Sequence, residues 1–277
     1  MFHLGQLGRG MVNKQVRAIP DGAILFDAAA FDAGAVPAPD ARWFDAAWWS
    51  VQGKSELRSA AGRGGVAFVQ TPLGWCVLRH YHRGGLAAVA SADRYVWTGA
   101  ARSRSFREFE LSSRLLHLGL PVPEPIAARC VREALTYRAD LLIRRLPGVQ
   151  TLAEALATGS LDASVASRVG RTLARFHSVG VWHADLNAHN VLLGDLSAGN
   201  TATDAVWLID FDRGRLRKPA LAWQESNLMR LRRSFVKLGA LSSTGDFDSG
   251  FWHPLLAEYH ARLATGANVR SNDGAAR

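Results

Sequence analysis

Residues 183–190 read HADLNAHN and lie between two apolar segments. This polar stretch places Asp185 and Asn190 five positions apart. When such a loop folds back on itself, the carboxylate can face an acceptor hydroxyl while the amide oxygen faces a divalent cation. The alternative is a simple polar turn, in which both side chains only cap backbone groups. The sequence on either side is needed to choose between the two.

A second acidic motif follows downstream. Residues 206–212 read VWLIDFD, which predicts a short buried strand with Asp210 at its end. Mg²⁺ prefers oxygen ligands, so we expect Asn190 and Asp210 to hold it, with Asp212 as a further candidate. Two acidic motifs in this order, each beside apolar strand residues, favour phosphate chemistry over two unrelated turns.

A glycine cluster lies in the first half of the chain, at Gly62, Gly64 and Gly65. Residues 66–81 (VAFVQTPLGWCVLRHY) follow it and predict a strand hairpin. Glycines let the backbone approach phosphates closely, so this cluster is a candidate nucleotide-covering loop, although a plain turn is the alternative. In the second strand, Arg79 is the candidate phosphate-binding cation, with Arg83 or a merely solvated strand end as alternatives.

A helix is predicted over residues 103–118, ended by Gly119 and Pro121. Glu108 in this helix is the expected ion-pair partner of Arg79, with Glu110 as the runner-up, which is what the family resemblance described below implies. Ser105 and Glu108 also have the spacing of a helix capping box, which is the competing interpretation of Glu108.

The pattern changes from strands to helices along the chain. A second strand pair is expected between residues 121 and 148, a helix over 161–179, and helices after Asp212. We therefore predict an α+β fold. Its N-terminal lobe, residues 1–146, has a small antiparallel sheet, its C-terminal lobe, 147–264, is helical, and 265–277 form a flexible tail.

Composition limits the function. The chain has 277 residues, a net charge of +9 and two cysteines without metal-ligand spacing, Cys76 and Cys130. Such a charge indicates an anionic partner, and the cysteines are expected to be buried and reduced. No signal peptide and no apolar segment of about 20 residues is evident, so we expect a soluble protein or one peripheral to a membrane.

Basic residues concentrate after the second acidic motif. Arg213, Arg215 and Arg217 begin a run, between residues 213 and 237, that contains eight Lys or Arg and one acid, Glu225. A basic cluster beside a metal site suits an anionic acceptor, so these three arginines are candidate substrate-binding residues. An apolar stripe in the same segment is expected to face the core, or else a membrane surface; its members are Leu228, Leu231, Phe235 and Leu238.

The order HxDxxxxN, apolar strand, then DF resembles the catalytic and metal-binding loops of the protein-kinase-like fold. The resemblance implies a two-lobed fold with ATP and Mg²⁺, Asp185 as catalytic residue, and His183 bracing the loop. The sequence departs from that pattern at Ala67, where a third glycine is usual, at Arg79, where lysine is usual, and at Asp212, where DFG has glycine. Few residues remain after Asp212, which favours a small-molecule or glycolipid kinase over a protein kinase.

Six segments, among them HADLNAHNVLL, LIDFDRGRLR and NLMRLRRSFVKL, are similar to the 3-deoxy-D-manno-octulosonic acid (Kdo) kinase family. The resemblance covers roughly residues 60–240. It implies ATP-dependent phosphorylation of the Kdo 4-hydroxyl on a Kdo–lipid A precursor, at the cytoplasmic face of the bacterial inner membrane. A lipopolysaccharide heptose kinase would share every catalytic residue. A basic nucleic-acid-binding protein or a pseudokinase is the non-enzyme alternative, and no nucleic acid is expected as a partner.

Overall fold

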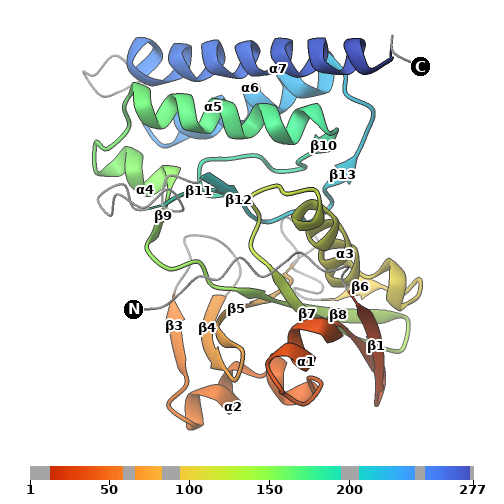
Figure 1. Cartoon of the computed structure of the whole chain (residues 1–277). Helices are drawn as coiled ribbons and strands as arrows, with labels where there is room; N and C mark the ends of the chain where they lie inside the picture. Colours follow the sequence, from red (N-terminus) through yellow and green to blue (C-terminus); the bar gives the residue numbers. More distant parts are fainter. Residues whose placement is uncertain (1–12, 59–65, 83–93, 195–205, 241–246, 275–277) are drawn as a thin grey trace. The chain divides into compact units, whose positions relative to one another are not determined.

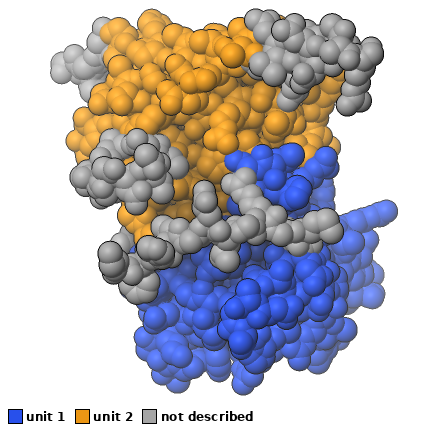
Figure 2. All heavy atoms as spheres, viewed as in Figure 1, with its two compact units in different colours: residues 1–119, 124–145 blue, residues 120–123, 146–277 orange. Residues whose placement is uncertain are grey.

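A computed structural model describes residues 13–58, 66–82, 94–194, 206–240 and 247–274, of which 266–274 are described by their backbone alone. The chain forms two compact units (Figures 1 and 2). Unit 1 comprises residues 1–119 and 124–145, and unit 2 comprises residues 120–123 and 146–277. Each unit is described by itself below.

Unit 1 is built on one antiparallel sheet of eight strands. Its strands follow the order β1-β2-β7-β8-β5-β4-β3, and β6 also pairs with β8. The predicted hairpin is present as β4 and β5, which are joined by a two-residue turn before Gly74. The strand bounds are β1 Lys14–Ile19, β2 Gly22–Asp27, β3 Ser55–Arg58, β4 Val66–Thr71, β5 Gly74–His80, β6 Tyr95–Val96, β7 Pro125–Glu133 and β8 Thr136–Arg144.

Both faces of this sheet are covered, because its central strands carry apolar side chains on both sides. One face packs against α1 (Ala28–Ala33), the 3-10 helix η1 (Ala41–Phe44) and α2 (Ala46–Val51). The other face packs against α3 (Arg104–His117), which follows the short 3-10 helix η3 (Ala100–Arg102). Successive β5 side chains point to opposite faces, so Arg79 and His80 face different layers.

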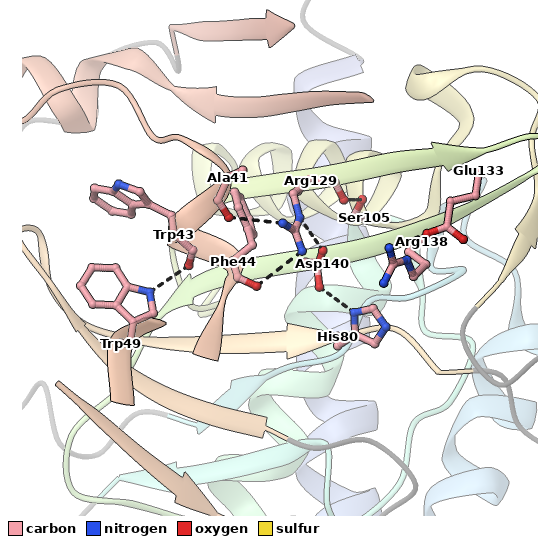
Figure 3. Close-up of polar contacts among 10 residues, drawn as sticks. All are labelled: Ala41, Trp43, Phe44, Trp49, His80, Ser105, Arg129, Glu133, Arg138 and Asp140. Carbon is pink, nitrogen blue, oxygen red and sulfur yellow. Dashed lines mark hydrogen bonds and ion pairs between the residues drawn. The ribbon is translucent and has the colours of Figure 1, made fainter. Parts of the chain in front are cut away.

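A buried polar network ties η1 to the sheet (Figure 3). Asp140, 2% exposed, shares a hydrogen bond of 2.6 Å with His80 Nδ1 and accepts one of 2.8 Å from Arg129 Nε. The three residues are direct cross-strand neighbours on β5, β8 and β7. The Arg129 guanidinium also donates to the carbonyl oxygens of Ala41 and Phe44. Charge-assisted bonds of this kind hold both ends of η1 in place.

Tryptophan side chains pack against one face of the sheet in unit 1. Trp43 and Trp49 are 8% and 2% exposed, their rings meet edge to face at 5.9 Å, and Trp49 Nε1 donates to the Trp43 carbonyl. Trp48 packs against the same cluster and is partly exposed. The apolar face of the sheet is thus closed by aromatic side chains that also satisfy a backbone acceptor.

Unit 2 is mainly helical. Its described helices are α4 (Leu152–Ala157), α5 (Ala163–Ser178), α6 (Leu221–Lys237), the π-helix η4 (Asp248–Trp252) and α7 (His253–Gly274). Its short strands are β9 (Val149–Thr151), β10 (Val181–Trp182), β11 (Val191–Gly194), β12 (Val206–Leu208) and β13 (Arg215–Leu216). β9, β11 and β12 form one small antiparallel sheet, and β10 pairs with β13.

Helices α5 and α7 lie side by side at very close range. A Cβ atom at Gly170 of α5 would meet the Leu255 carbonyl oxygen of α7 at 2.3 Å. α5 buries an apolar stripe of Val165, Val169, Leu173 and Phe176. α7 continues to Gly274, across the segment for which a flexible tail was expected, and 275–277 lie outside the described residues.

The predicted fold class, a mixed α+β chain with a sheet-rich N-terminal part and a helix-rich C-terminal part, is confirmed. Cys76 and Cys130 are free and buried, and burial raises the pKa of the Cys76 thiol to about 11. Among the helices that the structure describes, none is long and apolar enough to cross a membrane.

Candidate active site

The loop of residues 183–190 is organised around His183. This side chain is 2% exposed, and burial lowers its pKa, so the ring is neutral near pH 7. Its Nδ1 accepts a hydrogen bond of 3.1 Å from the Asp185 backbone amide, which leaves Nε2 protonated to donate to the Ile209 carbonyl at 2.9 Å. His183 therefore braces the loop, as predicted, and the Asp185 side chain is exposed beyond it.

Asn190 closes the loop from its other end. Its Nδ2 donates to the Asp185 carbonyl oxygen at 2.9 Å, and its own carbonyl accepts from the Ile209 amide at 3.1 Å. Ile209 thus bonds to both ends of the loop, once through His183 and once through Asn190. This pairing brings Asp185, Asn190 and Asp210 into one neighbourhood within unit 2, although they lie up to 25 positions apart in sequence.

The strand expected to end at Asp210 is shorter than predicted. β12 ends at Leu208, and Asp210 has a φ of 63°. Aspartate tolerates this left-handed conformation better than most residues do. The conformation changes the direction of the chain at Asp210. Phe211, 2% exposed, anchors the turn, with its ring 5.0 Å from the His183 ring and 6.0 Å from the Phe176 ring.

Two polar residues of helix α6 hydrogen-bond to the loop of residues 183–190, and neither was predicted from the sequence. Asn227, 1% exposed, accepts from the His183 amide at 3.1 Å and donates to the His183 carbonyl at 2.9 Å. Ser234 accepts from the Ala188 amide at 2.9 Å. Both are polar residues beside a buried apolar stripe, and such positions normally carry a partner when buried. The position of these two polar residues beside the apolar stripe was therefore the feature of the sequence that could have identified them.

The apolar stripe of α6 is core at three of its four positions. Leu228, Leu231 and Phe235 are at most 3% exposed, whereas Leu238 is 41% exposed and follows the helix end. The expectation that the stripe faces the core is confirmed for the three buried residues. The membrane alternative for those three is wrong, since they already pack within unit 2.

A second candidate cluster lies in unit 1. Arg79 of β5 forms an ion pair with Glu108 of α3, whose side chain is only 4% exposed. Tyr81 donates a hydrogen bond of 2.5 Å to the same carboxylate oxygen, and the Arg79 guanidinium lies 4.5 Å from the centre of the Tyr81 ring. Burial and the nearby Glu108 charge raise the pKa of Tyr81, so its hydroxyl stays a donor. The structure thus joins the two residues predicted to pair and adds a third.

The competing interpretations of Glu108 are wrong. The N-cap of α3 is Ser103, whose hydroxyl accepts from the Phe106 amide, while Ser105 donates to the Arg129 carbonyl. Glu110, the runner-up, pairs with Lys14 instead. Of the other predicted nucleotide residues, Gly62, Gly64 and Gly65 lie outside the described residues, as does Arg83.

The three candidate substrate-binding arginines lie on the surface of unit 2. Arg213, with a φ of 62°, and Arg215 and Arg217 of the β13 segment are all exposed. The Arg217 guanidinium lies 4.0 Å from the centre of the Trp182 ring. Stacking on Trp182 occupies one face of Arg217 and leaves its N–H groups at the edge.

The donor set near the loop suits a hard divalent cation. Asn190 uses its Nδ2 to bond Asp185, so the oxygen of the same amide is the atom left to face a metal. Asp210 and Asp212 supply carboxylate oxygens close by in the sequence. Amide and carboxylate oxygens are the ligands that Mg²⁺ takes in proteins. No cluster of three His, Cys, Asp or Glu with metal-site geometry occurs among the residues that the structure describes, so an asparagine ligand is essential to this assignment.

Comparison with known proteins gives a consistent result. Residues 46–259 match the model of the "Lipopolysaccharide kinase (Kdo/WaaP) family". A protein named 3-deoxy-D-manno-octulosonic acid kinase from Xanthomonas axonopodis pv. citri is 47% identical over 83% of this chain and 86% of its own length. One of the same name from Stenotrophomonas maltophilia is 45% identical over 83% of this chain and 86% of its own length.

Among solved structures, "WaaP in complex with acyl carrier protein" matches with a TM-score of 0.49 and 13% identity, covering 83% of this chain and 95% of that one. The family match spans most of the chain, including both the Arg79–Glu108 pair and the loop of residues 183–190. The chain therefore belongs to the lipopolysaccharide kinase (Kdo/WaaP) family.

Proposed function

We propose that this chain is a Kdo kinase, which transfers the γ-phosphoryl group of ATP to the 4-hydroxyl of Kdo on a Kdo–lipid A precursor. Three relatives with that printed name are 45%, 47% and 48% identical and are matched over 69% to 83% of this chain. The observation in the structure that supports the proposal best is the pairing of two loops through Ile209, because it gathers a carboxylate and two metal-ligand candidates.

Asp185 is the proposed catalytic residue. The acceptor hydroxyl donates its proton to the Asp185 carboxylate while its oxygen forms a bond to the γ-phosphorus, and the bond from that phosphorus to the β,γ-bridging oxygen breaks to release ADP. Asn187 Nδ2 donates to Asp185 Oδ2 at 3.1 Å and fixes the carboxylate orientation. The other oxygen, Oδ1, then faces the hydroxyl.

Asn190 and Asp210 are the proposed Mg²⁺ ligands, with Asp212 as a further candidate. When bound, the cation neutralises charge on the transferring phosphoryl group. The glycines 62, 64 and 65 are the proposed phosphate-covering loop, and Arg79 is the proposed cation on the phosphates. Glu108 and Tyr81 hold the Arg79 guanidinium, whose fork can bind phosphate oxygens in pairs.

The proposed acceptor is an anionic glycolipid, and Arg213, Arg215 and Arg217 are the proposed outer contacts with it. Their exposure and positive charge support a role in attracting the anionic headgroup. The proposed location is peripheral, at the cytoplasmic face of the inner membrane. A heptose kinase is the second candidate, because it would use the same catalytic residues.

The deciding experiment is incubation of the purified chain with Mg·ATP and either a Kdo–lipid A precursor or a heptose-containing acceptor. We expect mass spectrometry to find one added phosphate on the Kdo sugar of the first acceptor and none on the second. Phosphate on the heptose alone would replace the proposed function with the second candidate. No phosphate on either, with no binding of Mg·ATP, would contradict both.

A further inference from the structure

Arg230 of α6 stands apart from the neighbouring arginines of that helix. Arg232, two positions on, pairs with both carboxylate oxygens of Asp248 at 3.1 Å, and Arg233 is fully on the surface. Arg230 is half-buried, and its Nε is shielded from solvent without a hydrogen-bond partner. Within the described residues, its guanidinium makes no ion pair. A half-buried guanidinium left in this state is costly unless a ligand supplies the missing anion.

Arg230 lies on the face of α6 that contacts the loop of residues 183–190. Asn227 and Ser234, which bond the loop at His183 and Ala188, lie three residues before and four residues after Arg230. Residues at these spacings share one face of a helix, so Arg230 lies on the stripe that docks against the loop. Helical side chains lean toward the helix N-terminus, which inclines Arg230 over Asn227 and hence toward His183.

Electrostatics agree with this placement. The positive charge of Arg230 is near enough to His183 to contribute to lowering its pKa, after the larger effect of burial. Asp185 is two residues from His183 and is bonded to its ring. Arg230, which has no ion pair among the described residues, therefore lies near the loop that carries the proposed catalytic residue, within the same unit.

We propose that Arg230 binds the carboxylate of the acceptor sugar and so selects an acidic sugar over a neutral one. This inference rests on the proposed function, since it concerns the sugar presented to Asp185. The carboxylate and the 4-hydroxyl of Kdo belong to the same ring, so a guanidinium close to the base can hold the acid while the hydroxyl faces Asp185. A heptose has no carboxylate and leaves Arg230 unpaired, which disfavours it.

The test couples a residue change with an acceptor change. The acceptors, dispersed in detergent, are a Kdo–lipid A precursor and the same molecule with its Kdo carboxylate converted to a methyl ester. We expect wild-type kcat/KM to fall about 10- to 100-fold on the ester, the range for one charge-assisted hydrogen-bonded pair. The Arg230→Gln change should lower kcat/KM by a similar factor on the native acceptor. On the ester, it should alter kcat/KM by less than about threefold.

Controls separate this role from others. Arg262→Gln, which changes an exposed arginine of α7 in the same unit, should leave kcat/KM unchanged on both acceptors. Arg230→Lys keeps the charge without the planar fork and should recover part of the activity, with a melting temperature near wild type. The KM for ATP should be unchanged in every variant.

Three results would overturn the inference. Equal losses of Arg230→Gln on both acceptors would assign Arg230 a structural role, because its effect would be independent of the carboxylate. A raised KM for ATP with an unchanged KM for the acceptor would place Arg230 on the nucleotide. Wild-type protein that phosphorylates heptose and not the Kdo acceptor would remove the proposed function itself, and this inference with it.

Discussion

At the scale of single residues, the proposed chemistry depends most on Asp185. Asp185→Asn keeps the size of the side chain and removes the proton acceptor, so we expect kcat to fall about 10²- to 10⁴-fold. ATP affinity, measured by isothermal titration calorimetry with Mg·ATP, should stay within about twofold of wild type. His189→Ala is the matched control, because His189 is exposed in the same loop. An Asp185→Asn enzyme with full turnover would refute the catalytic assignment.

Tyr81 gives a second prediction at this scale. Tyr81→Phe retains the ring beneath Arg79 and removes the only hydroxyl that donates to Glu108 among the described contacts. A buried carboxylate that loses a donor should cost about 1–3 kcal/mol in the free energy of unfolding, measured by urea denaturation. We also expect the KM for ATP to rise more than kcat falls, because Arg79 loses its fixed position. An unchanged KM for ATP would show that the Arg79–Glu108 pair is positioned without Tyr81.

At the scale of elements, Gly170 makes the α5–α7 packing testable. In an isolated helix Gly→Ala is favourable by about 1 kcal/mol, but here the new methyl group would meet a backbone oxygen of α7 at 2.3 Å. We expect Gly170→Ala to destabilise the protein by about 1–3 kcal/mol in chemical denaturation. Gly250→Ala, where an added Cβ meets nothing within 4 Å, serves as the control and should be nearly neutral. A stabilised Gly170→Ala variant would contradict the close approach.

The same helix carries a pH-dependent residue, His177. Burial is the main cause that lowers its pKa to about 4, and it shares a hydrogen bond of 2.7 Å with the Tyr259 hydroxyl. The unfolded chain takes up a proton near pH 6.5 and the folded chain resists until about pH 4, so stability is constant above 6.5 and falls between those values. The loss attributable to His177 is on the order of 3 kcal/mol by pH 4.

Thermal or urea denaturation between pH 7.5 and 4.5 checks this expectation. His177→Gln should be less stable than wild type at pH 7.5 and should show a shallower decline on acidification. His183, whose pKa is also lowered by burial, remains in that variant and should leave a residual slope. A variant with the wild-type slope would mean that another group sets the acid limit.

The elements also show what the sequence could and could not predict. The hairpin β4–β5, helix α3 and helix α5 followed from apolar periodicity and from turn glycines, because those signals are local. The strands β1 and β2 were not predicted: β1 is almost wholly exposed, and β2 is a short apolar run that periodicity alone does not assign. Their place in the sheet depends on pairing with β7, about a hundred residues later, which no local pattern contains.

The candidate site likewise contains residues that local motifs reveal and residues that only the folded chain reveals. Asp185, Asn190 and Asp210 could be predicted as site residues because they lie in two short sequence motifs, residues 183–190 and 206–212. Asn227, Ser234 and Tyr81 were missed because each acts on a residue distant in sequence or in another element, and only the folded chain brings the partners together. The sequence shows Arg230 only as one member of a basic run, and only the structure shows that its Nε has no hydrogen-bond partner among the described residues.

At the scale of the whole molecule, the net charge of +9 should make the protein bind to anionic membrane surfaces, where its proposed acceptor lies. We expect the purified chain to bind vesicles that contain phosphatidylglycerol, and binding should weaken steeply as salt rises from about 0.05 to 0.5 M. Vesicles of phosphatidylcholine alone should not bind. Flotation on a sucrose gradient measures both. Salt-independent binding to neutral vesicles would show that apolar insertion, and not charge, governs attachment.

The outer face of α6 is the region of unit 2 where that attachment should concentrate. Met229 and Val236, 45% and 41% exposed, alternate there with the exposed cations Arg233 and Lys237. Exposed apolar side chains interleaved with cations are typical of surfaces that lie on anionic lipid. We therefore expect Arg233→Glu/Lys237→Glu to reduce vesicle binding at least tenfold, since each basic residue near an anionic surface contributes about 1 kcal/mol and the reversed charges repel it.

A matched double variant separates this local effect from net charge. Lys54→Glu/Arg102→Glu reverses two exposed cations of unit 1 and lowers the net charge by the same four units, from +9 to +5. If the α6 face makes the contact, this variant should keep most of the wild-type vesicle binding while the α6 variant loses it. Equal losses in the two variants would mean that the lipid responds to total charge alone. The acceptor would then reach Asp185 without a preferred docking face on α6.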